Sequence, residues 1–172
     1  MAETQDSGGW KQDDPYKPAD KDFKIKYTAS CSCGEVEYAV NSDPVSAKYC
    51  HCTDCQRLHG APFQWAALFH KEAVCFVKGV DCLMFYYPPD KEEEHHLPCK
   101  VSCSKCHSPM ADEGRKMWMA FPTLFKTDNG KLPEAFRATC HIFYKDRRLD
   151  IKDGTPKWSE LNNKSEQIQD EP

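Results

Sequence analysis

The chain has 172 residues, of which 40% are hydrophobic, and its 23 Lys and Arg against 27 Asp and Glu give a formal net charge of −4. A chain of this length can bury one hydrophobic core, which favours a single domain. It has no basic stripe, so the charge pattern argues against a nucleic-acid-binding protein. No apolar run approaches the roughly 18 residues that a membrane span requires, so no membrane partner is expected.

The polar, Gly- and Pro-containing residues 1–22 predict a flexible N-terminal arm, which Trp10 and Tyr16 could attach in part to the body. Residues 23–159 are predicted to form the domain, and residues 160–172 a frayed tail. Within the domain, alternation of apolar and polar residues or enrichment in aromatic and branched residues predicts short strands. These segments are 23–27, 36–40, 63–69, 74–77 and 82–87.

Helix signals are few. Residues 53–59 predict one short helix, and residues 133–136 predict another short piece. Short strands separated by turn residues indicate a mainly β fold with antiparallel sheets, few short helices, and zinc as a stabilising element.

The cysteines are the strongest functional signal. Of the eleven, seven lie in three clusters. The clusters are Cys31 and Cys33; Cys50, Cys52 and Cys55; and Cys103 and Cys106. Thiolates suit Zn²⁺, and a structural zinc site takes four of them in a tetrahedron. Seven clustered thiols therefore predict two zinc ions, one in a closed four-cysteine site and one in a three-cysteine site with an open position.

Cysteine usage also bears on the compartment. The first six residues lack the basic and apolar regions of a secretory signal. An odd number of cysteines cannot be fully paired within one chain. We therefore expect free thiols in a reducing compartment, the cytoplasm, rather than a disulfide-rich secreted domain.

The predicted closed site combines two knuckles, Cys31-x-Cys33 and Cys103-x-x-Cys106. Gly34 follows the first knuckle and permits a tight turn. The knuckles lie about 70 residues apart, so a shared zinc ion would close a long loop and serve a structural role. Cys99 is a possible replacement for one of these thiols.

The predicted open site contains Cys50, Cys52 and Cys55. Three thiolates leave a fourth position for water or substrate, as in catalytic zinc sites. A second structural zinc with a histidine as fourth ligand is the competing interpretation. His51 lies between two ligands, so its side chain is expected to point away. The better candidates for a fourth ligand or an acid–base role are His59 and His107.

Several of these residues occur in an ordered set that resembles a known family. The set is Cys31-x-Cys33-Gly34, Cys50-His51-Cys52-x-x-Cys55-Gln56-Arg57, Gly60-Ala61-Pro62-Phe63, and Cys103-x-x-Cys106-x-Ser108-Pro109. It is similar to the glutathione-dependent formaldehyde-activating (GFA) family, also called the centromere-protein-V domain, over about residues 24–160. The resemblance implies an Mss4-like β fold with a structural zinc on the closed site and a second zinc on the three-cysteine site.

The family's founding activity is the condensation of formaldehyde with glutathione to S-hydroxymethylglutathione, which is grouped with carbon–sulfur lyases. Fold transfers within such a family more readily than reaction. The chain departs from the family pattern at Ser102, where Phe is frequent, and at His107, where Gly is frequent. The imidazole of His107 could face the open site and supply a proton.

Three further patterns bear on the function. Arg57 could bind a carboxylate of a glutathione-like ligand in a fork, or it could be an ordinary surface arginine. His95-His96 lies in a charged run for which a solvated loop is the favoured interpretation, with nothing nearby to complete a metal site. We interpret Cys140 and His141 as a buried cysteine beside a surface histidine.

The sequence therefore favours a carbon–sulfur lyase-type enzyme, in which zinc on Cys50, Cys52 and Cys55 activates a thiol such as glutathione or a thiol adduct of a small electrophile. The alternative is a non-catalytic binding module in which both zinc ions are structural. A zinc-ribbon nucleic-acid binder is a third interpretation, which the net charge opposes. A homo-oligomer is compatible with the sequence.

Overall fold

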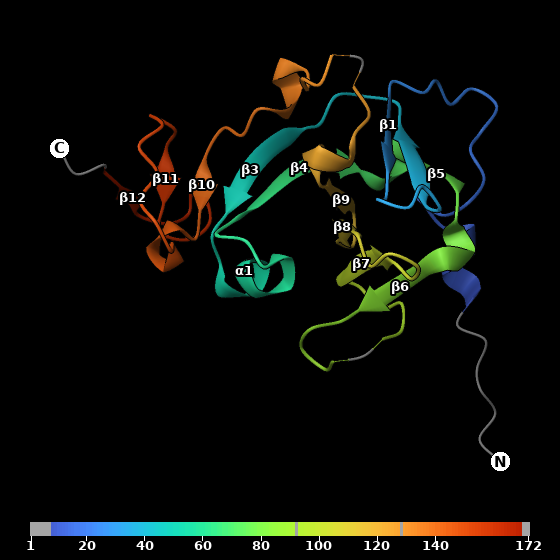
Figure 1. The fold of residues 1–172 in the computed structure, drawn as a ribbon, viewed down its shortest axis with the longest axis horizontal. Helices are drawn as coiled ribbons and strands as arrows, with labels where there is room; N and C mark the ends of the chain where they lie inside the picture. Colours follow the sequence, from blue (N-terminus) through green and yellow to red (C-terminus); the bar gives the residue numbers. More distant parts are fainter. Residues whose placement is uncertain (1–7, 92, 128, 170–172) are drawn as a thin grey trace. The chain divides into compact units, whose positions relative to one another are not determined.

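The computed structural model describes residues 8–91, 93–127 and 129–169 (Figure 1). The chain divides into two units: Met1–Asp43 with Phe69–Lys131, and Pro44–Leu68 with Leu132–Pro172. The predicted mainly β fold class is confirmed, because the described residues contain twelve short strands and one α-helix. No helix in the described ranges is both long and apolar enough to cross a membrane.

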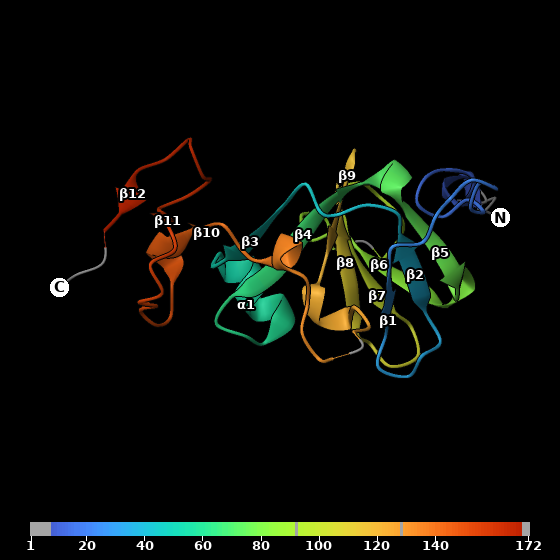
Figure 2. The ribbon, with the colours of Figure 1, turned by 90° about the horizontal axis from the view of Figure 1, so that it is seen from above.

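The strands of the first unit are β1 (Tyr27–Ser30), β2 (Glu37–Val40), β5 (Val74–Lys78), β6 (Leu83–Tyr86), β7 (Cys99–Cys103), β8 (Pro109–Glu113) and β9 (Met117–Ala120). Its short 3₁₀ helices are η1 (Gly8–Gln12), η2 (Lys71–Ala73), η3 (Val80–Cys82) and η4 (Pro122–Leu124). β1, β2 and β5 form an antiparallel three-stranded sheet (Figure 2). β6, β7, β8 and β9 pair consecutively and antiparallel.

Aromatic side chains form the core of the first unit. Tyr38 of β2 and Trp118 of β9 are fully buried, and their rings meet edge to face at 5.6 Å. Phe76 of β5 meets the same Trp118 ring at 5.8 Å. Such pairs bury large apolar areas and join the two sets of strands. This core holds β7 and β8, whose ends carry the second cysteine knuckle.

The N-terminal segment also reaches this core. Tyr16 is 5% exposed and its ring stacks on Phe76 at 5.2 Å. Trp10 packs against Tyr16 at 4.6 Å. Residues 1–7 of the predicted arm lie outside the described residues, so the proposed arm boundary stays a prediction.

The second unit contains β3 (Ser46–Cys50), α1 (Thr53–His59), β4 (Gln64–His70, which ends in the first unit), η5 (Glu134–Phe136), β10 (His141–Ile142), η6 (Tyr144–Asp146), β11 (Lys157–Trp158) and β12 (Gln167–Ile168). β3 pairs antiparallel with β4, while β10 pairs parallel with both β3 and β11. These parallel pairs depart from the predicted antiparallel arrangement. β12 lies within the predicted tail and pairs with β11.

The predicted helix at residues 53–59 is observed as α1, and its ends follow from local chemistry. Cys52 is the N-cap, and its sulfur accepts a hydrogen bond from the Cys55 amide at 3.4 Å. Gly60 ends the helix in the left-handed conformation, with φ of 57°. The helix therefore begins inside the cysteine cluster, so its formation and the placement of the thiols depend on each other.

Candidate metal centres

The four predicted closed-site cysteines converge in the first unit. Cys31, Cys33, Cys103 and Cys106 place their sulfur atoms within 4.8 Å of one another. The Cys31 and Cys33 sulfurs are 3.5 Å apart, and those of Cys33 and Cys103 are 3.9 Å apart. A tetrahedral zinc ion with Zn–S bonds of about 2.3 Å separates its ligands by about 3.8 Å. The donor set and its spacing therefore fit one zinc ion.

Ser108 links the two knuckles of this site. Its hydroxyl oxygen lies 3.2 Å from the Cys106 sulfur and accepts a hydrogen bond from the Ser32 amide at 3.1 Å. Hydrogen bonding from Ser108 lowers the pKa of Cys106 to about 5. Gly34 adopts φ of 75° and its amide bonds back to the Cys31 carbonyl at 3.0 Å. Hydrogen bonds within the protein therefore hold the backbone of both knuckles in place without help from a metal ion.

Cys99 does not belong to the closed site. Its sulfur lies 3.6 Å from Glu113 Oε2 in a separate buried group with His95. Glu113 is fully buried and also accepts hydrogen bonds from Tyr16 at 2.6 Å and His95 at 2.9 Å. The expectation that nothing near His95 completes a metal site is not met, because folding places donor atoms of His95, Cys99 and Glu113 within 4.8 Å of one another.

We interpret His95, Cys99 and Glu113, together with Lys71, as a buried ion-pair network rather than a third metal site. The Lys71 ammonium contacts Glu113 Oε1 and supplies the compensating positive charge. A metal cation would have to approach a carboxylate that is already neutralised by Lys71. Burial works to raise the pKa of Glu113, but hydrogen bonds from His95, Lys71 and Tyr16 outweigh it and hold the pKa below its usual value.

The three predicted open-site cysteines converge in the second unit. The sulfur atoms of Cys50, Cys52 and Cys55 lie within 4.8 Å of one another. Among the described residues of this unit, no fourth His, Cys, Asp or Glu donor joins them. The candidate fourth ligand His59 is therefore not part of the cluster, and neither is His51, which was expected to point away.

The cluster already concentrates negative charge on one sulfur. Hydrogen bonds from the neighbouring Cys50 and Cys55 thiols lower the pKa of Cys52 to about 2, and the Cys55 and Asp54 amides act in the same direction. The hydrogen bond with Cys52 correspondingly raises the pKa of Cys50 to about 11. A thiolate held by thiols and helix amides is the form that binds a soft cation. The group therefore fits zinc with one coordination position left open.

The His51 ring points away from the cysteines, as the sequence predicts, and contacts a buried partner. His51 Nε2 lies 2.8 Å from His141 Nδ1, and His141 Nε2 lies 3.0 Å from Asp153 Oδ2. Both rings are at most 1% exposed. The expectation of a surface His141 is therefore wrong, because parallel pairing places β10 directly beside β3. Burial first, and then the electrostatic interaction with His141, lower the pKa of His51 to about 4.

Gln56 braces the loop that carries the cysteines. Its side-chain nitrogen donates to the His51 carbonyl at 2.6 Å and to the Asp146 carbonyl at 2.9 Å. Its side-chain oxygen accepts a hydrogen bond from Arg148 Nε at 2.7 Å. Gln56 is 7% exposed, so one buried amide ties the loop, α1 and the segment after η6 together.

Arg57 is exposed and lines an open cavity of about 380 Å³, together with Gln56, Gly60, Ala61, Pro62 and Arg148. This placement is compatible with the predicted carboxylate contact, which stays a prediction.

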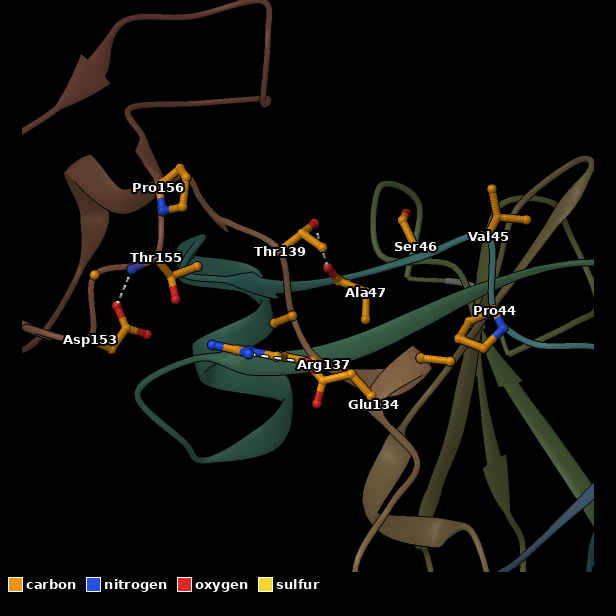
Figure 3. A pocket seen from close by; sticks show the side chains of 13 residues that line it. Pro44, Val45, Ser46, Ala47, Glu134, Arg137, Thr139, Asp153, Thr155 and Pro156 are labelled. Carbon is orange, nitrogen blue, oxygen red and sulfur yellow. Dashed lines mark hydrogen bonds and ion pairs between the residues drawn. The ribbon is translucent and has the colours of Figure 1, made fainter.

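A second cavity of this unit, of about 530 Å³, is shown in Figure 3. Its charged groups are already paired. Arg137 bonds to Glu134 at 3.1 Å, and Asp153 accepts from the Thr155 amide at 3.0 Å as well as from His141. The cavity therefore presents no unpaired charge among the side chains that Figure 3 labels.

His107 belongs to the first unit, so its predicted role at the three-cysteine cluster stays a prediction. Its backbone has φ of 58°, and its amide donates to the Cys103 carbonyl at 2.9 Å. A left-handed turn at this position explains why glycine suits it and why a side chain here carries strain.

The fold and the site together define a small β-rich protein with two cysteine clusters that could hold metal ions. A family model described as "Glutathione-dependent formaldehyde-activating enzyme" matches residues 26–146. The match covers more than half of the chain, and the chain belongs to this family. The expected family membership is thereby confirmed.

Among solved structures, a protein of Rhodobacter sphaeroides is similar, with 20% sequence identity and a TM-score of 0.48. The match covers 62% of this chain and 97% of that one. No curated protein matches the sequence.

Proposed function

We propose that the protein is a zinc-dependent, carbon–sulfur lyase-type enzyme that acts on a thiol such as glutathione or on a thiol adduct of a small electrophile. The observation that carries this proposal is the convergence of Cys50, Cys52 and Cys55 without a fourth His, Cys, Asp or Glu donor among the described residues of their unit. Membership of the GFA family supports the reaction class.

Cys50, Cys52 and Cys55 would hold the catalytic zinc, and Cys31, Cys33, Cys103 and Cys106 the structural one. Zinc in the three-cysteine site supplies Lewis acidity and favours the thiolate form of a bound thiol, which is the nucleophilic form.

The chain's own residues prepare this site. The Cys55 amide at the start of α1 donates to Cys52 and helps keep it ionised. Gln56 fixes the His51 carbonyl, which holds the intervening backbone in place. The buried His51–His141 contact supports the same loop from its other side. A site held from both sides needs little rearrangement when substrate arrives.

Zinc content and turnover test this proposal together. Native mass spectrometry of the purified chain should show two zinc ions. After glutathione is added, the native protein should also show a glutathione adduct. Cys52→Ser should lose this adduct and abolish turnover of a glutathione–aldehyde mixture, while the fold persists. Cys75→Ala, at a buried cysteine of β5 outside both clusters, is the matched control and should keep both zinc ions.

Unchanged turnover in Cys52→Ser would contradict the proposal. Two zinc ions without any thiol adduct or turnover would instead favour the non-catalytic binding module, with both ions structural.

A further inference from the structure

Two arginines from distant parts of the second unit line the cavity of about 380 Å³ described above. Arg57 lies on α1, two positions after Cys55, and Arg148 follows η6. None of the described residues that line this cavity carries a carboxylate. In a chain with a net charge of −4, two guanidinium groups at one small cavity are a local concentration of positive charge.

The Arg148 guanidinium is held in a fixed orientation. Its Nε donates to Gln56 Oε1 at 2.7 Å. The side-chain nitrogen of Gln56 in turn donates hydrogen bonds to the His51 and Asp146 carbonyls. Among the described residues, no hydrogen bond or ion pair engages the two terminal nitrogens of Arg148, so they can bind another acceptor, while the bond to Gln56 orients the side chain relative to the cysteine loop. A guanidinium group that is already oriented loses little conformational entropy when it binds a planar anion such as a carboxylate.

Two other arginines of the second unit form ion pairs with acidic residues. Arg147 pairs with Asp150 at 2.5 Å, and Arg137 pairs with Glu134 at 3.1 Å. Among the described residues, no ion pair engages Arg57 or Arg148.

We propose that Arg148 and Arg57 form a carboxylate-binding subsite in this cavity, and that Arg148, oriented by Gln56, is the residue that makes the protein prefer a thiol with a carboxylate group over one without it. The inference rests on the proposed function for the identity of the substrate as a thiol. Gln56 gives the subsite its position, because the same side chain that orients Arg148 also bonds the backbone between Cys50 and Cys52.

The subsite is tested first without any thiol. Succinate is titrated into zinc-loaded protein while the side-chain NMR signals of Arg148 Nε–H and the Gln56 amide are followed. We expect saturable shifts in the native chain and their loss in Arg148→Gln. Arg57→Gln, which leaves every Gln56 hydrogen bond in place, should weaken succinate binding by about tenfold. Arg115→Gln, at an exposed arginine on the β8–β9 loop, is the matched control and should bind succinate normally.

The second arm compares 3-mercaptopropionate with its amide. The native protein should prefer the carboxylate by about tenfold or more, and Arg148→Gln should lose this preference while its affinity for the amide is kept. Arg148→Lys keeps the charge but not the fork, so it should restore only part of the preference.

Equal binding of the two thiols by the native chain, or an unchanged preference in Arg148→Gln, would overturn the subsite. Inorganic phosphate that shifts the Arg148 signal when succinate does not would overturn the carboxylate assignment. If succinate binds at Arg148 but neither thiol binds at all, the subsite stands and the proposed thiol chemistry fails.

Discussion

His51 Nε2 and His141 Nδ1 lie 2.8 Å apart, and both side chains are buried. Asp153 determines which of the two ring nitrogens carries the proton. Its carboxylate accepts from His141 Nε2 at 3.0 Å, so a neutral His141 has only a lone pair at Nδ1. His51 must then donate from Nε2, and its own Nδ1 is unprotonated. Among the described residues, that Nδ1 atom is buried without a hydrogen-bond partner.

This chain of contacts predicts the tautomers. In ¹⁵N–¹H NMR spectra at neutral pH, both His51 and His141 should be Nε2–H tautomers. Asp153→Asn should disturb the His141 tautomer and lower the free energy of unfolding by about 1–3 kcal/mol, because a charge-assisted hydrogen bond to a buried ring is lost. Asp150→Asn is the matched control, since Asp150 is exposed and forms an ion pair with Arg147.

A native spectrum with His141 protonated at Nδ1 would contradict this assignment. So would equal destabilisation by the two aspartate substitutions, because the exposed pair at Asp150 should contribute about 0–1 kcal/mol.

The two cysteine clusters should differ in what they do for stability. Cys103→Ser removes a fully buried ligand that joins β7 to the knuckle before β2. Because zinc binding at such a site contributes directly to folding, this variant should bind one zinc ion fewer and unfold at much lower temperature. Cys52→Ser should also lose one zinc ion but keep most of the unfolding temperature, since its cluster spans only the six residues from the end of β3 to the first turn of α1 and closes no long loop.

Zinc content by mass spectrometry and thermal unfolding by circular dichroism measure both effects. Similar unfolding temperatures for Cys103→Ser and Cys52→Ser would show that the division into a structural and an open site is wrong.

The buried hydrogen bonds of Glu113 should make the free energy of unfolding depend on pH in the acid range. Its pKa is lower in the folded chain than the value of about 4.3 expected on unfolding. A carboxyl with a depressed pKa contributes stability that is present above the unfolded pKa and is lost as pH falls through the folded one. Glu113→Gln should therefore be destabilised by about 3 kcal/mol at pH 7, and the gap to the native chain should narrow below pH 4.3.

Urea unfolding between pH 3 and 7 measures this gap. Glu134→Gln, at an exposed glutamate, is the control and should follow the native curve throughout. A gap for Glu113→Gln that stays constant with pH would show that the carboxylate charge is not what Tyr16, Lys71 and His95 stabilise.

Local patterns predicted much of this structure. The cysteine knuckles, α1 and the strands β2, β4, β5 and β6 depend on residues close in sequence, so spacing and alternation are enough to find them. Seven of the twelve described strands were not predicted: β3, β7, β8, β9, β10, β11 and β12. The sulfur ligands Cys31, Cys33, Cys103 and Cys106 were found because knuckles have a recognisable spacing even when they lie far apart. The strand predicted at residues 23–27 is observed four residues later, at Tyr27–Ser30. Alternation alone does not mark where pairing with β2 begins.

What the sequence did not reveal depends on contacts across about 90 residues. Arg148 meets Gln56 over a separation of 92 residues, and His141 meets His51 over 90. His141 looked like a surface residue because a two-residue parallel strand such as β10 leaves no periodic pattern. Ser108 and Gln56 stood within the motifs that resemble the family, and that position was the available signal for their importance.

Two substitutions of His107 can distinguish the effect of its backbone conformation from the role of its side chain. Its φ of 58° costs a non-glycine residue about 1 kcal/mol or more, so His107→Gly should raise the free energy of unfolding by up to about 1 kcal/mol, offset in part by the greater freedom of glycine in the unfolded chain. His107→Ala keeps the strain but removes the imidazole. If the imidazole supplies a proton in turnover, both variants should lose activity by a similar factor, and their pH profiles should change alike.

If the imidazole has no such role, His107→Gly should be the more stable variant and both should turn over at the native rate. Chemical denaturation and a turnover assay on the two zinc-loaded variants distinguish these cases, because only the backbone effect differs between Gly and Ala. Loss of activity in both, with stability gained only in His107→Gly, would mean that the chain keeps a strained residue at the knuckle for its side chain. This outcome is the one expected if the departure from the family's glycine is functional.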